Sequence, residues 1–298
     1  MANDPQVPWT DEQWARVNQV IQEEAKRARV AATFLPLYGP LSADSDYVRK
    51  QEIRYPPLGV AGRLDIDDRD TMRLATLQVI VPVRNAQMAD PEMSSVLALF
   101  RRAVNAVARL EDAVVFRGLA SGGSAPQGGV VGLPVIWQIT GALAAEGLWS
   151  RAATRPRWLK IEFRPPVTRS NRLVTAVSTA IGRLEGRGQF GPFATVLGQR
   201  LFAVAQTPDP GSLVLPQDRI IPFLGGGPLL RSSTLDDFGG YSGMVVALGG
   251  APLELVIATD VCLQFLQVTD QPAFLFRLSE KIALRIREPD AIVQLYMR

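Results

Sequence analysis

The chain has 298 residues, of which 47% are hydrophobic and 20% are charged, and its net charge is +3. This composition favours a folded protein of one large or two ordinary domains and argues against a disordered or fibrous chain. The absence of histidine and the single cysteine, Cys262, exclude Ser-His-Asp and Cys-His catalysis, histidine-ligated metals and a disulfide framework. A reducing cytoplasm fits this cysteine content.

The first third of the chain predicts a helix followed by an extended arm. Neither a signal peptide nor an apolar run long enough to cross a bilayer is recognisable. Thr10–Gln13 (TDEQ) match a capping box, and the apolar spacing that follows predicts an amphipathic helix over Asp11–Ala31. The next residues, to Asp70, are rich in Pro and Gly and too poor in apolar residues to build a core, so we expect strands that project outward. Thr76–Arg84 (TLQVIVPVR) predicts the returning strand.

A long helix is predicted next. Asp90 is a candidate N-cap, Pro91 suits the first helical position, and an apolar stripe continues until Gly118. A helix over Pro91–Arg117 would be about 40 Å long at 1.5 Å per residue. Such a helix would form the architectural spine of a domain.

Two adjacent acids, Glu111 and Asp112, lie inside this helix and raise the possibility of a paired-carboxylate active site. Adjacent helical residues point about 100° apart, which is poor geometry for a catalytic pair. Arg109 and Arg117 are close enough in sequence to be ion-pair partners. We therefore interpret the acids as architectural, through an ion pair or a hydrogen bond to a neighbouring element.

The second half indicates an α+β chain with segregated strands. A helix is predicted over Ser170–Glu185, a buried strand over Pro192–Gly198 and a short helix over Gln199–Gln206. Further strands are predicted at Met244–Leu248, Leu253–Leu266, Ala273–Ile286 and Ile292–Tyr296.

Two motifs resemble ligand-binding sequences, but neither meets the other requirements of such a site. Gly186–Gly191 (GRGQFG) match G-x-G-x-x-G but lie between a helix and a strand, the reverse of the order that binds a pyrophosphate. Asp65–Asp70 (DIDDRD) lack the glycine and the final glutamate of a calcium loop, and we interpret them as a solvated charged arm that could also pair with Arg of a neighbouring subunit. No catalytic residue, metal site or cofactor is predicted, and scattered charges make nucleic acid a weak candidate partner.

Several stretches in order resemble the encapsulins, a bacteriocin/linocin-like family of nanocompartment shell proteins with the HK97 phage capsid-like fold. The spine sequence VARLEDAVVFRG (Val107–Gly118) carries the resemblance first. The other matching stretches are Asp11–Arg27, Gly39–Leu41, Gly128–Pro134, Gly188–Gly198, Leu253–Leu266 and Phe276–Tyr296. Between Gly118 and Pro192 the chain is longer than compact members, and the resemblance assigns no role to this insertion.

The resemblance implies a division of the chain. Residues 1–41 would form the N-terminal helix and arm, and residues 42–84 the extended loop. The peripheral domain with its spine would comprise residues 85–130 and 231–298, and the axial domain residues 131–230.

The resemblance also implies a function. Many identical subunits would form an icosahedral shell in the cytoplasm and enclose a cargo enzyme that bears a C-terminal targeting peptide. Such cargo is often a dye-decolorizing peroxidase or a ferritin-like protein. The alternative is a phage or prophage major capsid protein of the same fold; an enzyme is not expected. No match to the flavin site of some members is found, so no cofactor is carried over.

Two candidate sites follow from the family's architecture. The cargo peptide would dock on Ile21 and Phe34 and on Leu263 and Phe265, which alternate onto one face of a strand. The alternative is that these four residues are core.

The second candidate site is the five-fold pore. It would be lined by the loop that contains Asp209, Pro210, Gly211 and Asp218, whose two acids would ring the opening with negative charge. The alternative is an ordinary surface loop.

Overall fold

The computed structural model describes residues 6–56, 61–153, 160–163, 170–208, 213–238, 241–270 and 273–297. The helices are α1 (Asp11–Ala28), α2 (Ala31–Phe34), α3 (Asn85–Met88), α4 (Ser94–Arg117), α5 (Leu148–Ala153), α6 (Ser170–Glu185), α7 (Gln199–Ala205), α8 (Pro216–Ile220), η2 (Ile221–Leu224), η3 (Ser233–Phe238) and η4 (Pro289–Ala291). The strands are β1 (Leu37–Tyr38), β2 (Tyr47–Arg49), β3 (Glu52–Arg54), β4 (Asp65–Asp67), β5 (Thr71–Arg73), β6 (Ala75–Arg84), β7 (Gly118–Leu119), β8 (Trp137–Thr140), β9 (Ala145–Glu146), β10 (Lys160–Phe163), β11 (Phe193–Leu197), β12 (Leu229–Arg231), β13 (Ser242–Ala247), β14 (Leu253–Val268), β15 (Ala273–Ile286) and β16 (Ile292–Met297).

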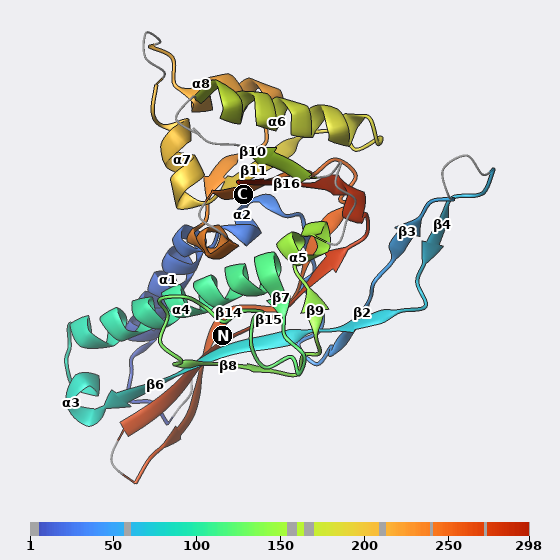
Figure 1. Cartoon of the computed structure of the whole chain (residues 1–298). Coiled ribbons are helices and arrows are strands. Elements are labelled where there is room, and N and C mark those ends of the chain that lie inside the picture. Colours follow the sequence, from blue (N-terminus) through green and yellow to red (C-terminus); the bar gives the residue numbers. More distant parts are fainter. Residues whose placement is uncertain are drawn as a thin grey trace.

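The first sheet has the order β1-β14-β15-β6-β8 and packs against α4 and α1 (Figure 1). In β6 every second residue from Ala75 to Val83 is buried, which is the alternation of a sheet with one covered face. An aromatic group joins the helices to this sheet: the rings of Trp9 and Phe276 stack at 5.0 Å, and Trp14 packs edge-on against Trp9. The predicted strands over residues 76–84, 253–266 and 273–286 are confirmed.

The spine helix α4 is confirmed, although it begins at Ser94 rather than at Pro91. Met93 has left-handed backbone geometry, with φ of 52°, so the helix cannot extend back through it. The Asp90 carboxylate still accepts the Ser94 backbone N–H, at 3.2 Å. The predicted N-cap at Asp90 and the predicted start at Pro91 are therefore wrong: the N-cap residue is Met93, although the Asp90 side chain still bonds to the first residue of the helix.

The first helix also ends earlier than predicted. Its capping box is present: Gln13 N donates to the Thr10 hydroxyl, and Thr10 N donates to the Gln13 side chain. However, Arg29 is extended, so the chain leaves the helix after Ala28 and begins the separate turn α2 at Ala31. The single predicted helix over Asp11–Ala31 is therefore two helices with Arg29 between them.

The second sheet has the order β10-β16-β13-β11-β12. Every residue of β11 and β13 is buried, because both faces of the sheet are covered. Helices α6, α7 and α8 cover one face (Figure 1), and residues such as Val196 and Met244 on the other face join the core of the first sheet. The predicted helix over Ser170–Glu185 and the buried strand at β11 are confirmed.

The predicted extended arm comprises residues 47–73, hereafter the arm. It contains two short antiparallel ribbons, β2–β5 and β3–β4, and Figure 1 shows it leaving the body as a long projection. Its described side chains are exposed or half-buried. The expectation that this segment projects away from the core is confirmed.

Strand pairing crosses two of the predicted domain limits. β8 lies beyond residue 131 but pairs with β6 in the first sheet. β13 and β16 lie beyond residue 231 but belong to the second sheet, where β13 pairs with β11. The physical reason is that β13 is apolar on both faces and needs the cover that α6 provides. The division into peripheral and axial domains remains a prediction, and the sheets do not follow its limits at these strands.

Candidate functional site

Glu111 and Asp112 belong to a largely buried charge cluster. Its members are Arg29, Glu111, Asp112, Asp260 and Glu280. Arg29 Nε lies 2.8 Å from a Glu111 oxygen, and its Nη2 lies 2.7 Å from Glu280 and 2.8 Å from Asp260. The guanidinium therefore joins the α1–α2 junction to α4, β14 and β15. Glu111 and Glu280 have fully buried side chains, whereas that of Asp260 is exposed.

Asp112 points to a different partner. Its Oδ1 accepts the backbone N–H groups of Val30 and Ala31, at 3.2 and 2.8 Å. These are the first N–H groups of α2, which have no partner within the helix. A side chain from the spine thus caps a helix that lies far from it in sequence.

Burial shifts the pKa values of the acids in this cluster, which outnumber its cation. Burial raises the pKa of Glu111 well above its ordinary value, and the nearby Glu280 charge raises it further. Burial likewise raises the pKa of Glu280 to about 7, and burial together with the Glu111 charge raises that of Asp112 to about 8. Burial therefore favours the protonated forms of these acids, and Arg29 offsets part of their charge.

The two acids have structural roles. Both are buried, and they bond to different elements, so they cannot act together on a substrate. The architectural interpretation is supported, but the predicted partners are wrong. Arg109 donates to the Val131 carbonyl at 2.7 Å, and Arg117 donates to the Gly129 carbonyl at 3.0 Å, so both fix the chain that follows the spine.

The arm carries its ion pairs at the surface. Arg49 pairs with Asp68 at 2.9 Å, and Lys50 with Asp70 at 3.4 Å. Arg54 pairs with Asp67. Three acids of the DIDDRD motif thus pair within their own arm.

Few contacts tie the arm to the body. Ile53 N donates to the Arg287 carbonyl at 2.9 Å, and the Tyr55 hydroxyl donates to Glu288 at 2.6 Å. At the base, Arg285 donates to the Arg49 carbonyl. The arm therefore has an anchored base and a long projecting part.

The four predicted cargo residues are all buried in one core cluster. Phe265, the most exposed of them at 7%, packs against Phe276, and Phe34 packs on Phe116 of the spine. The alternation holds, because Leu263 and Phe265 are buried while Gln264 is exposed. This placement favours the alternative that these residues are core. In the same strand, Leu266 and Val268 are exposed apolar residues that the sequence analysis did not select.

The predicted pore residues divide into two groups. Asp209, Pro210 and Gly211 lie outside the described residues. Asp218 is exposed in the first turn of α8. Near it in the sequence, the apolar side chains of Leu213, Val214, Ile221 and Phe223 are exposed.

The described part of the chain offers neither a membrane-spanning helix nor a metal-binding cluster. No helix there is long and apolar enough to cross a membrane. No group of three or more His, Cys, Asp or Glu side chains is arranged there to hold a metal ion.

Comparison with known proteins gives consistent matches. Residues 2–130 and 140–283 match the family described as "Encapsulating protein for peroxidase". A type 1 encapsulin shell protein of Myxococcus xanthus (strain DK1622) is 26% identical over 97% of this chain and 93% of its own length. A virus-like particle from Pyrococcus furiosus has a TM-score of 0.67 at 15% identity, covering 95% of this chain and 99% of its own. The Mycobacterium phage Bobi structure has a TM-score of 0.58 at 12% identity, covering 92% and 90%.

Proposed function

Because this chain belongs to the encapsulin shell-protein family and has the HK97 capsid-like fold, we propose that it assembles into a closed icosahedral nanocompartment in the cytoplasm. The observation that carries the proposal is the arm, which leaves both cores and makes only a few contacts with its own body. A projecting segment of this kind gains stability by lying on symmetric neighbours. The protein would act as a structural shell and not as an enzyme.

We propose that the shell encloses a cargo protein with a C-terminal targeting peptide, such as a dye-decolorizing peroxidase or a ferritin-like protein. The docking region would be the seam between α1 and β14, where Gln22 of α1 donates to the Val261 carbonyl at 3.1 Å. Ile21, Phe34, Leu263 and Phe265 would support this region from beneath. The exposed side chains of Leu266 and Val268 offer apolar contact at the end of β14.

Two serine substitutions in one strand test the docking proposal. Leu263→Ser places a hydroxyl in the core and should destabilise the subunit by about 2–5 kcal/mol, as large-to-small core changes do. Leu266→Ser should leave folding unchanged and reduce cargo loading about tenfold, because one apolar contact is worth about 1.5–3 kcal/mol. Loading equal to that of the parent in Leu266→Ser shells would remove Leu266 from the docking region.

For the pore, we propose that residues 207–219, which end in α8, surround the five-fold axis. Asp218 is exposed at the start of α8 and Asp209 precedes it in the sequence, so symmetry would repeat each charge around the opening. Replacing both acids with Ala should change cation entry into loaded shells and leave assembly intact. Unchanged cation flux would contradict the assignment.

Assembly itself is tested on the purified chain. It should elute as a megadalton particle in size-exclusion chromatography and appear as hollow, nearly spherical shells in negative stain. Co-expression with a candidate cargo enzyme should fill those shells only when the C-terminal peptide of the cargo is present. A stable monomer or dimer at micromolar concentration would contradict the proposed function.

A further inference from the structure

A single carboxylate oxygen joins the arm to the turn that leads into the second sheet. Glu288 lies in the connection between β15 and η4, and its Oε2 accepts two hydrogen bonds. The Tyr55 hydroxyl donates one at 2.6 Å, and the Gln189 side-chain amide donates the other, also at 2.6 Å. Tyr55 belongs to the arm, directly after β3, whereas Gln189 lies between α6 and β11. Glu288 therefore contacts both the projecting arm and the second sheet's turn.

The motif GRGQFG, which does not meet the requirements of a nucleotide site, explains how Gln189 reaches Glu288. Gly188 has left-handed backbone geometry, with φ of 78°. The Gln189 N–H donates to the Leu184 carbonyl at 3.0 Å. The Gly188 N–H donates to the Glu185 carbonyl at 2.9 Å, which completes the Schellman pattern that ends a helix. The Gln189 side chain is buried, and its described hydrogen bond goes to Glu288 and not to the arm.

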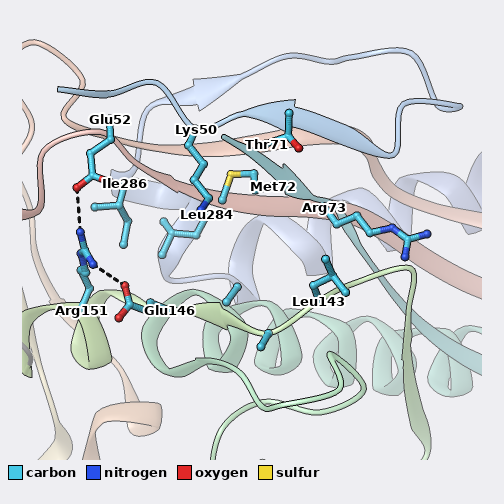
Figure 2. A pocket seen from close by; sticks show the side chains of 12 residues that line it. Lys50, Glu52, Thr71, Met72, Arg73, Leu143, Glu146, Arg151, Leu284 and Ile286 are labelled. Atoms are coloured by element: carbon cyan, nitrogen blue, oxygen red, sulfur yellow. Dashed lines mark hydrogen bonds and ion pairs between the residues drawn. The ribbon is translucent and has the colours of Figure 1, made fainter. Parts of the chain in front are cut away.

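The helix α5 forms a second link between the arm and the second sheet. Arg151 of α5 lies 2.9 Å from Glu52 of β3 and 2.9 Å from Glu146 of β9. Figure 2 shows this bridge at one end of the residues that line a cavity of about 420 Å³. In the same helix, the Trp149 carbonyl accepts the Gln294 side chain of β16 at 2.8 Å. The helix is thus bonded to β3 and to the second sheet.

The arm segment of residues 52–55 is therefore held on the body at three points. Between Glu52 and Tyr55, the Ile53 N–H donates to the Arg287 carbonyl at 2.9 Å. The hydrogen bond from Tyr55 is charge-assisted and raises the pKa of Tyr55 to about 12, so the phenol keeps its proton at neutral pH. Together these contacts fix the direction of the β3–β4 ribbon relative to the body.

We propose that Glu288 and Arg151 clamp residues 52–55 to the second sheet, so that the direction of the arm follows the position of that sheet. If the second sheet turned relative to the first, Gln189 would carry the Glu288 side chain with it, and Tyr55 would follow the same oxygen. The arm and the loop before α8 are the parts that we propose for contacts with other subunits, so the clamp would couple these contacts. The inference goes beyond the proposed shell function, because the clamp lies within one subunit.

Hydrogen exchange of the Ile53 amide reports how firmly the arm is held, and mass spectrometry of peptides from residues 50–56 of the intact chain measures it. Gln189→Leu keeps the size of the side chain and removes a donor that is not bonded to the arm. It should speed the exchange by about three- to tenfold, because Glu288 is no longer held in position. Tyr55→Phe should speed it by about tenfold. The double variant should exchange no faster than Tyr55→Phe alone, because both changes act on one oxygen.

The second link is tested in the same way, and two controls separate the clamp from general loosening. Arg151→Gln should also speed the exchange at Ile53, since it removes the link through α5. Glu185→Gln changes an exposed acid at the end of α6 and should exchange as the parent does. Peptides from β11 report the second sheet itself and should keep the parent rate in Gln189→Leu. Light scattering of the same samples reports assembly separately, so a failure to form shells is distinguished from a loose arm.

Three results would overturn the proposal. The first is parent-like exchange at Ile53 in Gln189→Leu or in Arg151→Gln. The second is that the effects of Gln189→Leu and Tyr55→Phe multiply, since Gln189 would then act on the arm by a route other than Glu288. The third is equal acceleration in β11, because the second sheet would then be loosened as a whole.

Discussion

The arm and the charge cluster use the same ion-pair chemistry in opposite surroundings. In the arm, Arg49 and Asp68 meet in solvent, whereas in the cluster Arg29 meets Glu111 and Glu280 inside the core. An exposed pair contributes about 0–1 kcal/mol, but removing one member of a buried pair costs about 3–5 kcal/mol. The difference separates two roles: the cluster stabilises the fold of the subunit, and the arm, whose pairs are exposed, is the element that we propose for contacts with other subunits.

The largest effect is expected from shortening the arm. Lys50 N donates to the Asp70 carbonyl at 3.0 Å, so the chain can be closed there by replacing residues 51–69 with a two-residue Gly turn. This variant keeps the β2–β5 ribbon and both cores. Because its remaining contacts lie within the subunit, we expect a folded chain by circular dichroism that forms no shells in negative stain.

Tyr55→Phe is the control for that deletion. It removes the hydrogen bond to Glu288 and leaves the length of the arm unchanged. Shells should form as in the parent. If the shortened chain still forms normal shells, the arm is not the assembly element.

The second effect concerns folding. Arg29→Met removes the only cation within ion-pair distance of Glu111 in the described chain. It leaves buried acids uncompensated, and the free energy of unfolding should fall by about 3–5 kcal/mol, measured by urea unfolding.

A triple variant sharpens this prediction. Arg29→Met combined with Glu111→Gln and Glu280→Gln removes the buried charges together with their counter-ion, so it should recover part of the lost stability. A loss for Arg29→Met no larger than that for Arg49→Met would contradict the distinction between the cluster and the arm.

The sequence predicted the helices and strands of both regions far better than it predicted which side chains form ion pairs with each other. Period and composition identified α4, α6, β6 and the arm, because each depends on local spacing of apolar residues or on prolines and glycines. The start of α4 was missed because Met93 adopts a left-handed conformation that no helical propensity reveals.

The charge cluster shows what local reasoning cannot reach. Arg109 and Arg117 were predicted as partners of Glu111 and Asp112 because they are near in sequence, but the true partner, Arg29, comes from another helix. The spacing of apolar residues does not identify Arg29 as the partner of Glu111. Its position at the end of the N-terminal helix is only a weak indication. The burial of Phe34 and Leu263 could not be predicted either, because core residues and docking residues show the same spacing of apolar side chains.

A third prediction concerns pH. The folded-state pKa values of Glu280, about 7, and Asp112, about 8, lie above the ordinary carboxyl value near 4. Between about pH 4 and pH 8 the folded chain therefore keeps protons on these carboxyl groups that the unfolded chain has already released. The contribution of these groups to stability is fully present below about pH 4 and is lost as the pH rises through about 7 to 8.

Glu280→Gln, which is neutral at every pH, should make the decline in unfolding free energy from about pH 5 to pH 8 shallower than in the parent. Glu12→Gln, an exposed acid of α1, serves as the control and should leave the slope unchanged. Urea midpoints at a series of pH values provide the measurement. Equal slopes for the parent and Glu280→Gln would show that the cluster does not bind protons in this range.

The smallest effect is expected for the pairs of the arm. Arg49 and Asp68 have side chains that are 66% and 54% exposed, so water and salt screen their attraction. In a double-mutant cycle of Arg49→Gln and Asp68→Asn, the coupling energy should be at most about 1 kcal/mol and should decrease as salt rises from about 0.05 to 0.5 M. The arm should keep its rate of proteolytic cleavage in both variants, because its anchors at Arg287 and Glu288 are backbone and hydroxyl contacts that neither change touches. A salt-independent coupling of several kcal/mol would mean that the arm, like the cluster, is held rigidly by its charges.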